Sequence, residues 1–149
     1  MHKVQNYFKI QELVDKKVYQ IYGERAWKFF DISLLDTLLV LRENLNLPIT
    51  INNWLWKGKF TQRGLRHNKS SIVRNKDGIY LSAHLFGKAI DFDVKGMSAV
   101  DVREWILNNE NKFKHKIRLE NKLNGKPINW VHLDTLSEEN NPKIYLFNV

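Results

Sequence analysis

The chain has 149 residues, of which 43% are hydrophobic, and a length near the commonest domain size predicts one folded domain over residues 1–149. Five Trp in an aromatic content of 12% exclude a disordered chain, because such side chains are tolerated in water only when they are buried or stacked. The net charge of +8 favours anionic partners without choosing among them, and the lack of cysteine excludes disulfides and thiolate metal sites.

The N-terminal third is predicted to be helical. Two short helical turns are expected over 10–14 and 18–23, where Gly23 would end the second turn, and together they would cover the core as a lid. A longer helix is expected to start at Ser33, because Ser33 and Asp36 form a variant of the capping box and leucines follow at helical spacing.

Beyond Pro48, which would end that helix, the pattern changes to strands and loops. The β-branched residues of 49–52 predict a buried strand. Residues 54–78 show no sustained period and are rich in Gly, Lys, Arg, Asn and Ser, so we expect a long loop of the kind that is usually functional or disordered. Strand pieces are expected over 79–81 and 89–94.

The last third is predicted to hold a capped helix that begins at Ser98 and then a β-hairpin. The arms of the hairpin would be 116–119 and 128–133, because Asn124-Gly125 between them is a strong turn signal. The expected fold class is therefore α+β, with a small, mostly antiparallel sheet that carries the functional site and helices packed on its outer face.

Two histidine motifs carry the chemistry. The first, Ser-x-His-x-x-Gly-x-Ala-x-Asp, contains His84 and ends at Asp91, and the second, Trp-x-His-x-Asp, contains His132 and ends at Asp134. Asp91 lies in an otherwise apolar strand and needs a partner, which a divalent cation shared with histidines would supply. Each motif alone could be an ordinary surface strand with a polar face, but the two together favour zinc, with a fourth coordination position left for water.

These motifs resemble those of the M15 zinc peptidases, which are D-Ala-D-Ala carboxypeptidases and murein endopeptidases and share a fold with the metal-binding domain of hedgehog proteins. The resemblance covers roughly residues 10–136. The resemblance is less close upstream of the first motif. There, residues 48–54 and 60–66 look like the strand and the basic loop of phage-encoded and prophage members. The resemblance implies a zinc ion held by His84, Asp91 and His132.

The resemblance also implies substrate contacts in the basic loop. Arg63 or Arg66 would bind a substrate carboxylate, because a planar guanidinium suits bidentate recognition better than an ammonium does. Gln62 in the same loop and Ser82 in the first motif are the other residues expected to bind substrate. The alternative for the arginines is a solvated basic loop.

The general base departs from the family pattern. Many members have Glu or Asp three residues before the final histidine, but this chain has Asn129, which cannot accept a proton at neutral pH. Glu120 on the other arm of the hairpin is the preferred base, because it could reach across to the metal site. Asp134 would assist it or orient a histidine ring.

The predicted function is zinc-dependent hydrolysis of peptide bonds in the stem or cross-link peptides of peptidoglycan, as in a phage endolysin; both endopeptidase and carboxypeptidase activity fit. Zinc would activate water and polarise the peptide carbonyl while a carboxylate takes the proton. An inactive zinc domain that binds a wall peptide or a protein partner stays open as an alternative, which Asn129 would permit. The charge also suits a nucleic-acid-binding domain, but no helix-turn-helix, zinc-finger or RNP motif is present, so no specific nucleic acid partner is expected.

The N-terminal residues lack the apolar core of a signal peptide, and no apolar run is long enough to cross a membrane. We therefore expect synthesis in the cytoplasm without Sec export, no membrane insertion, and a monomer that acts on the cell wall after release or delivery.

Overall fold

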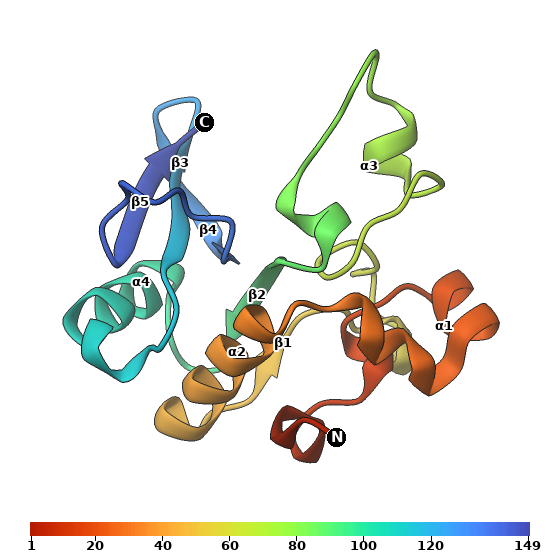
Figure 1. Ribbon diagram of the computed structural model, residues 1–149, viewed down its shortest axis with the longest axis horizontal. Coiled ribbons are helices and arrows are strands. Elements are labelled where there is room, and N and C mark those ends of the chain that lie inside the picture. The colour runs from red at the N-terminus through yellow and green to blue at the C-terminus, as the bar shows by residue number, and fades with distance from the viewer.

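The strands of the computed structural model, which describes residues 1–149, form one five-stranded mixed sheet in the order β1-β2-β4-β3-β5 (Figure 1). The strands are β1 Ile49–Thr50, β2 Ala89–Val94, β3 Ile117–Leu123, β4 Lys126–Asp134 and β5 Ile144–Asn148. The helices are α1 Lys16–Tyr22, α2 Ile32–Leu45, α3 Ser71–Arg74 and α4 Ala99–Asn108. Short 3-10 turns span Lys3–Asn6, Ile10–Glu12, Gly23–Phe29, Trp54–Trp56, Ala83–Phe86 and Glu110–Lys112. The expected α+β class is confirmed.

The pairing of the strands is mostly antiparallel, as predicted. β2 pairs antiparallel with β1 and β4, and β3 pairs antiparallel with β4 across the turn at Asn124 and Gly125, both of which have positive φ. The exception is β5, a strand that the sequence analysis missed, which pairs with β3 in parallel. It adds the edge of the sheet at which the chain ends in Figure 1.

Helix α2 begins earlier than predicted. Its N-cap is Asp31, whose carboxylate accepts a hydrogen bond from the backbone N–H of Ser33 at 2.9 Å, so Ser33 lies inside the helix and does not cap it. Asp36 forms no capping box with Ser33, because its carboxylate contacts His2 at 2.9 Å and His115 at 2.7 Å. The predicted N-terminus was wrong because Asp31, two residues before Ser33, already caps the helix with its carboxylate.

The expected strand over 79–81 does not form. These residues belong to an arm that projects beyond α3 and rises above the rest of the molecule (Figure 1), where no neighbouring strand offers backbone partners. Ile79 is 93% exposed and Leu81 71% exposed. The loop predicted over 54–78 is irregular apart from the turn at Trp54–Trp56 and helix α3.

Side-chain alternation along the strands separates a core face from a polar face. Phe92 of β2 and Leu133 of β4 are fully buried in one hydrophobic cluster of 27 residues, which also takes in Leu38 of α2 and Ile106 of α4. Ile10 and its neighbours from the N-terminal segment are buried in the same cluster, as expected for a segment that covers the core. The opposite face of β2, β3 and β4 carries the polar residues described below. No helix is both long and apolar enough to span a bilayer.

Two glycines allow the chain to approach itself closely beside this polar face. Gly87 has a φ of +65°, and a Cβ there would lie 1.9 Å from the carbonyl oxygen of Phe29. A Cβ at Gly64 would lie 2.0 Å from the carbonyl oxygen of Leu13. Gly87 directly follows the turn at 83–86, and the carbonyl of Gly64 contacts His84 within it, so close packing of backbone fixes that turn against the N-terminal half of the chain.

Substitution of Gly87 by Ala should lower the free energy of unfolding by more than the strain of placing Ala at a positive φ. In Gly96→Ala, where φ is +83° but no atom lies within 4 Å of the new Cβ, we expect a loss of only about 1–2 kcal/mol. Gly87→Ala should lose roughly 2 kcal/mol more, because the backbone of Phe29 must also shift. Urea unfolding of both variants measures this difference, and equal losses would contradict the packing argument.

Candidate metal centre

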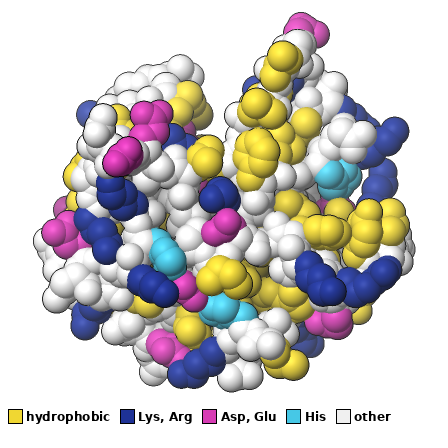
Figure 2. All heavy atoms as spheres, in the orientation of Figure 1, with side chains coloured by type: hydrophobic (Ala, Val, Ile, Leu, Met, Phe, Trp, Pro, Cys, Tyr) yellow, Lys and Arg dark blue, Asp and Glu magenta, His cyan; other side chains and the backbone are white.

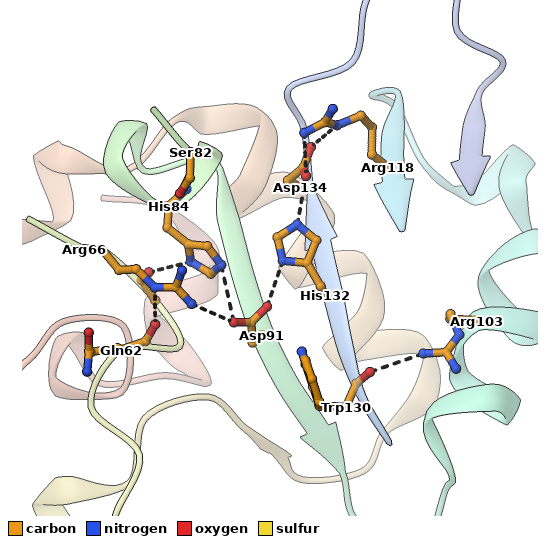
Figure 3. A network of polar contacts seen from close by, with 11 residues as sticks. Gln62, Arg66, Ser82, His84, Asp91, Arg103, Arg118, Trp130, His132 and Asp134 are labelled. Carbon is orange, nitrogen blue, oxygen red and sulfur yellow. Dashed lines mark hydrogen bonds and ion pairs between the residues drawn. The ribbon is translucent and has the colours of Figure 1, made fainter. Parts of the chain in front are cut away.

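Three side chains from separate segments converge on one point of the polar face. Asp91 of β2 lies directly opposite His132 in the β2–β4 register, and His84 comes from the turn at 83–86. The Asp91 carboxylate lies 2.8 Å from His132 Nδ1 and 3.3 Å from His84 Nε2, and candidate ligand atoms of the three residues all lie within 4.8 Å of one another. In Figure 3 both imidazole rings point toward Asp91. The group can hold a metal ion.

The hydrogen-bond partners of His84 indicate what belongs at this point. Its Nδ1 lies 2.8 Å from the carbonyl oxygen of Gly64, which can only accept, so Nδ1 carries the hydrogen. In the neutral ring Nε2 then presents a lone pair to the Asp91 carboxylate at 3.3 Å. Two acceptors that face each other call for a cation between them, and histidine nitrogen with carboxylate oxygen is a suitable donor set for a divalent metal.

A fixed chain of contacts also orients His132. Its Nε2 lies 2.9 Å from the Asp134 carboxylate, which is fully buried, and Arg118 of β3 donates to both oxygens of that carboxylate at 2.7 and 3.0 Å. Arg118 in turn lies over the ring of Phe147 of β5. With Nε2 held by Asp134, Nδ1 of His132 is directed toward Asp91 and can present a lone pair to a metal ion once its proton is lost. Partners such as Asp134 usually raise the affinity of a metal ligand.

Charge and burial set the protonation of the three residues in the metal-free protein. Burial lowers the pKa of His84, and the contact with Asp91 offsets this only in part, so the ring stays neutral. Burial by itself raises the pKa of Asp91, but its contacts with His132 and His84 outweigh that effect and hold the pKa well below its usual range. Burial also lowers the pKa of His132, but hydrogen bonds to Asp134 and Asp91 outweigh that effect and raise the pKa to about 9.

The metal-binding group lies in a cleft of about 500 Å³. One wall is the base of the projecting arm, and the other is the exposed side of β3, β4 and β5; Figure 2 shows the surface hollowed between these parts. Besides the residues already named, the lining comprises Arg66, Tyr80, Leu81, Ser82, Ala83, Glu120, Trp130, Leu136 and Val149. A bound molecule would therefore meet apolar walls with the metal group between them.

Glu120 is the carboxylate of the cleft that has no partner. Its Cα lies opposite that of His132 in the β3–β4 register, and its side chain makes no hydrogen bond or ion pair. Burial raises the pKa of Glu120; the positive charge of His132 lowers it and the negative charge of Asp91 raises it further. Asp134, by contrast, is occupied by Arg118 and His132, which hold its pKa low although burial alone would raise it. Of the two carboxylates, Glu120 is the one free to exchange a proton.

Of the four residues expected to bind substrate, two line the cleft and two do not. Arg66 and Ser82 line the cleft: Arg66 donates to Asp91 at 3.1 Å, and the Ser82 hydroxyl accepts from the backbone N–H of His84. Gln62 and Arg63 lie outside it, in an adjoining hollow. The Gln62 side chain holds the start of α3 by bonding to Ser71 and Ile72, and Arg63 pairs with Asp93 at 2.7 Å and lies over the ring of Phe60.

Asn129 lies away from the cleft, in a hollow beside α4. Three positions from His132 on a strand place it on the other face of the sheet, so this residue and Glu120 do not share a site. Sequence reasoning missed Arg118 and Phe147. Arg118 could have been found, because it lies two positions before Glu120 and must therefore face the same side of the strand. Phe147 could not, because its strand was not foreseen.

The contact between Arg118 and Asp134 predicts an effect on metal affinity at a distance. Arg118→Lys keeps the charge but removes the forked hydrogen bond, so Asp134 should orient His132 less firmly and the affinity for Zn²⁺ should fall about tenfold. Arg25→Lys, an exposed change far from the cleft, is the matched control. Competition with a chromogenic chelator measures both, and unchanged affinity in Arg118→Lys would rule out the orienting role.

Metal binding should depend on pH through His132. With a pKa of about 9 against an ordinary 6.5, this ring is protonated at neutral pH in the metal-free protein and must lose its proton to become a ligand. Apparent Zn²⁺ affinity should therefore rise by up to about tenfold per pH unit between pH 6.5 and 9. The raised pKa stabilises the metal-free fold fully below pH 6.5, and that contribution is lost as the pH rises through about 9. Chelator competition across this range tests the slope, and a flat profile would contradict it.

Comparisons of this chain with protein-family models, with curated proteins and with solved structures find no match.

Proposed function

We propose that this chain is a zinc-dependent peptidase of the M15 type that hydrolyses peptide bonds in the stem or cross-link peptides of peptidoglycan. One observation carries the proposal. His84, Asp91 and His132 converge in a cleft in which Glu120, the one carboxylate without a partner, lies opposite a metal-ligating histidine. A site that can hold a metal ion next to an unpaired carboxylate has the groups that metal-assisted hydrolysis commonly uses.

Zinc is the ion that this donor set suits best. Two imidazole nitrogens and one carboxylate oxygen form a common catalytic zinc set, and the chain has no cysteine to offer instead. The buried carboxylate and the oriented rings provide ligands whose direction is already fixed. When bound, zinc supplies Lewis acidity that activates water and polarises the carbonyl of the peptide.

Glu120 is proposed as the general base. Its carboxylate is free, and burial raises its pKa above the ordinary value of a glutamate. A raised pKa suits a group that must take up a proton from water and later release it to the departing amine. Asp134 cannot serve in its place, because Arg118 and His132 occupy both of its oxygens. We therefore assign Asp134 the role of orienting His132.

Arg66 and Ser82 are proposed to bind the substrate. The Arg66 guanidinium uses Nε on the carbonyl oxygen of Gln62 and Nη2 on Asp91, which leaves further N–H groups for a substrate carboxylate. The Ser82 hydroxyl accepts from the backbone of His84, so its own hydrogen is free to be donated. Both groups line the same cleft as Glu120.

The class of substrate comes from the resemblance of the two motifs to the M15 family. The lining of the cleft agrees with a peptide that carries free carboxylates, since Tyr80, Trp130 and Phe147 can pack against its aliphatic parts while Arg66 attracts its charge. Peptidoglycan peptides, with short aliphatic residues and free carboxyl groups, have this chemistry.

Glu120→Gln should abolish hydrolysis without removing the metal. We expect kcat on purified muropeptides to fall at least about 100-fold, because the amide cannot accept a proton, while Zn²⁺ affinity changes little. Asn129→Ala should leave hydrolysis nearly unchanged, because that side chain lies outside the cleft. Mass spectrometry of the muropeptides identifies the bond that is cut.

His84→Ala is the control for dependence on the metal, since it should lose both zinc and hydrolysis. If the zinc-loaded wild-type chain cleaves none of the muropeptides, the proposed activity is wrong, and a zinc domain that binds a wall peptide or a protein partner takes its place. If Glu120→Gln cleaves as fast as the wild type, the peptidase survives but Glu120 is not its base.

A further inference from the structure

A second hollow on the surface is lined only by polar and charged side chains. It measures about 280 Å³ and lies between α1, the loop that precedes α3, and α3 itself. Its cationic residues are Lys16, Lys17, Lys69 and Arg74, and Thr61, Ser70 and Ser71 add hydroxyl groups. Figure 2 shows Lys and Arg side chains gathered around a histidine on the side of the molecule near α3.

The four cations of this hollow are not neutralised by the protein. None of them forms an ion pair or a side-chain hydrogen bond. The only carboxylate in the lining, Asp15, accepts from the backbone N–H of Val18 with one oxygen and contacts His67 Nε2 at 2.6 Å with the other. Lys69 donates its backbone N–H to His67 Nδ1, so the ring hydrogen is on Nε2 and is given to Asp15. The positive charge therefore remains available to a ligand.

The hydroxyl groups of the hollow are also donors without an acceptor. Ser70 Oγ accepts from the backbone N–H of His67 at 3.0 Å, and Ser71 Oγ accepts from Gln62 Nε2 at 2.8 Å. Neither hydroxyl hydrogen has a partner in the protein, so both can be donated outward. A site rich in donors and positive charge, and poor in acceptors and apolar surface, suits a compact anion with several acceptor oxygens.

The hollow is also linked to the cleft through residues that line neighbouring hollows. An intermediate hollow shares Thr61 and Gln62 with it, and shares Arg66, Asp91 and Trp130 with the cleft. Lys59 lines that intermediate part and forms no ion pair, whereas Arg63 and Arg66 there are paired with Asp93 and Asp91. A chain held in the cleft and bearing an anion further along could reach the hollow.

We propose that the hollow around Lys16, Lys17, Lys69, Arg74, Ser70 and Ser71 is a binding site for a phosphate group. Tetrahedral phosphate presents acceptor oxygens in several directions, which matches cations and hydroxyls contributed from different segments. The site is separate from the metal centre and does not depend on the proposed hydrolysis. The phosphate can come from a small phosphate ester or from a phosphodiester polymer such as a polyol phosphate chain of the wall.

The test is a titration of the ¹⁵N-labelled, zinc-loaded chain with inorganic phosphate and with poly(glycerol phosphate), at constant ionic strength, followed by NMR. Backbone amides of Ser70 and Ser71 should shift and saturate. Lys69→Gln/Arg74→Gln should weaken binding about tenfold or more, because two uncompensated charges at the site are lost. Lys112→Gln/Lys114→Gln, which removes the same charge from exposed positions elsewhere, should change it less than about twofold.

Equal weakening by the two double variants would show only attraction by net charge and would overturn the proposal. So would shifts confined to Asp91, His132 and their neighbours, which would place the anion in the cleft, or the absence of any saturable shift. If the polymer binds at least about tenfold more tightly than inorganic phosphate, with the same sensitivity to Lys69→Gln/Arg74→Gln, the source is the phosphodiester chain. Equal affinity per phosphate, with the same sensitivity to Lys69→Gln/Arg74→Gln, means that the site recognises the phosphate group alone, as a small ester would present it.

Discussion

The burial of Asp91 in the middle of β2 is the constraint from which the rest of the site follows. This residue is 7% exposed, and a carboxylate so far removed from water is tolerated only with compensating partners. The partners come from different segments: His132 from β4, His84 from the turn at 83–86, and Arg66 from the loop before α3. Because one charge needs all of these segments in place, the backbone around it is tightly fixed.

Two carboxylates of the cleft differ in role because their surroundings differ. Asp134 and Glu120 both face the metal group, yet Asp134 is fully buried and saturated with hydrogen bonds, whereas Glu120 is half-buried and free. A site with one fixed and one free carboxylate can hold a ligand rigidly and still leave a group able to move a proton. Glu120 reaches the polar face from the other arm of the hairpin, opposite His132, whereas Asn129 lies on the other face of the sheet.

Local sequence signals predicted the parts of this fold that depend on few partners. The bounds 89–94 of β2, the turn at Asn124 and Gly125, and the shared face of His132 and Asp134 follow from period-two alternation and turn chemistry. The failures depended on partners distant in sequence. The apolar residues of 79–81 look like a strand but find no neighbour to pair with.

The residues of the candidate site show the same contrast between local signals and distant partners. Motif spacing brought His84, Asp91 and His132 together correctly, because each lies on or beside a strand whose faces can be read from the sequence. The function of Gln62 as an anchor of α3, in contrast, depends on contacts with Ser71 and Ile72 that no pattern announces. β5 was missed for a related reason: its parallel pairing with β3 requires a long connection, which leaves no turn signal.

The close contact between Gly64 and Leu13 gives the N-terminal segment an influence on chemistry in which it takes no direct part. The carbonyl of Leu13 accepts the N–H of Leu65, and the carbonyl of Gly64 fixes the hydrogen on His84. Leu13, which does not line the cleft, thereby helps to position the carbonyl that sets the tautomer of His84. A change in the N-terminal segment that displaces this backbone would therefore alter the orientation of His84 without changing any side chain of the cleft.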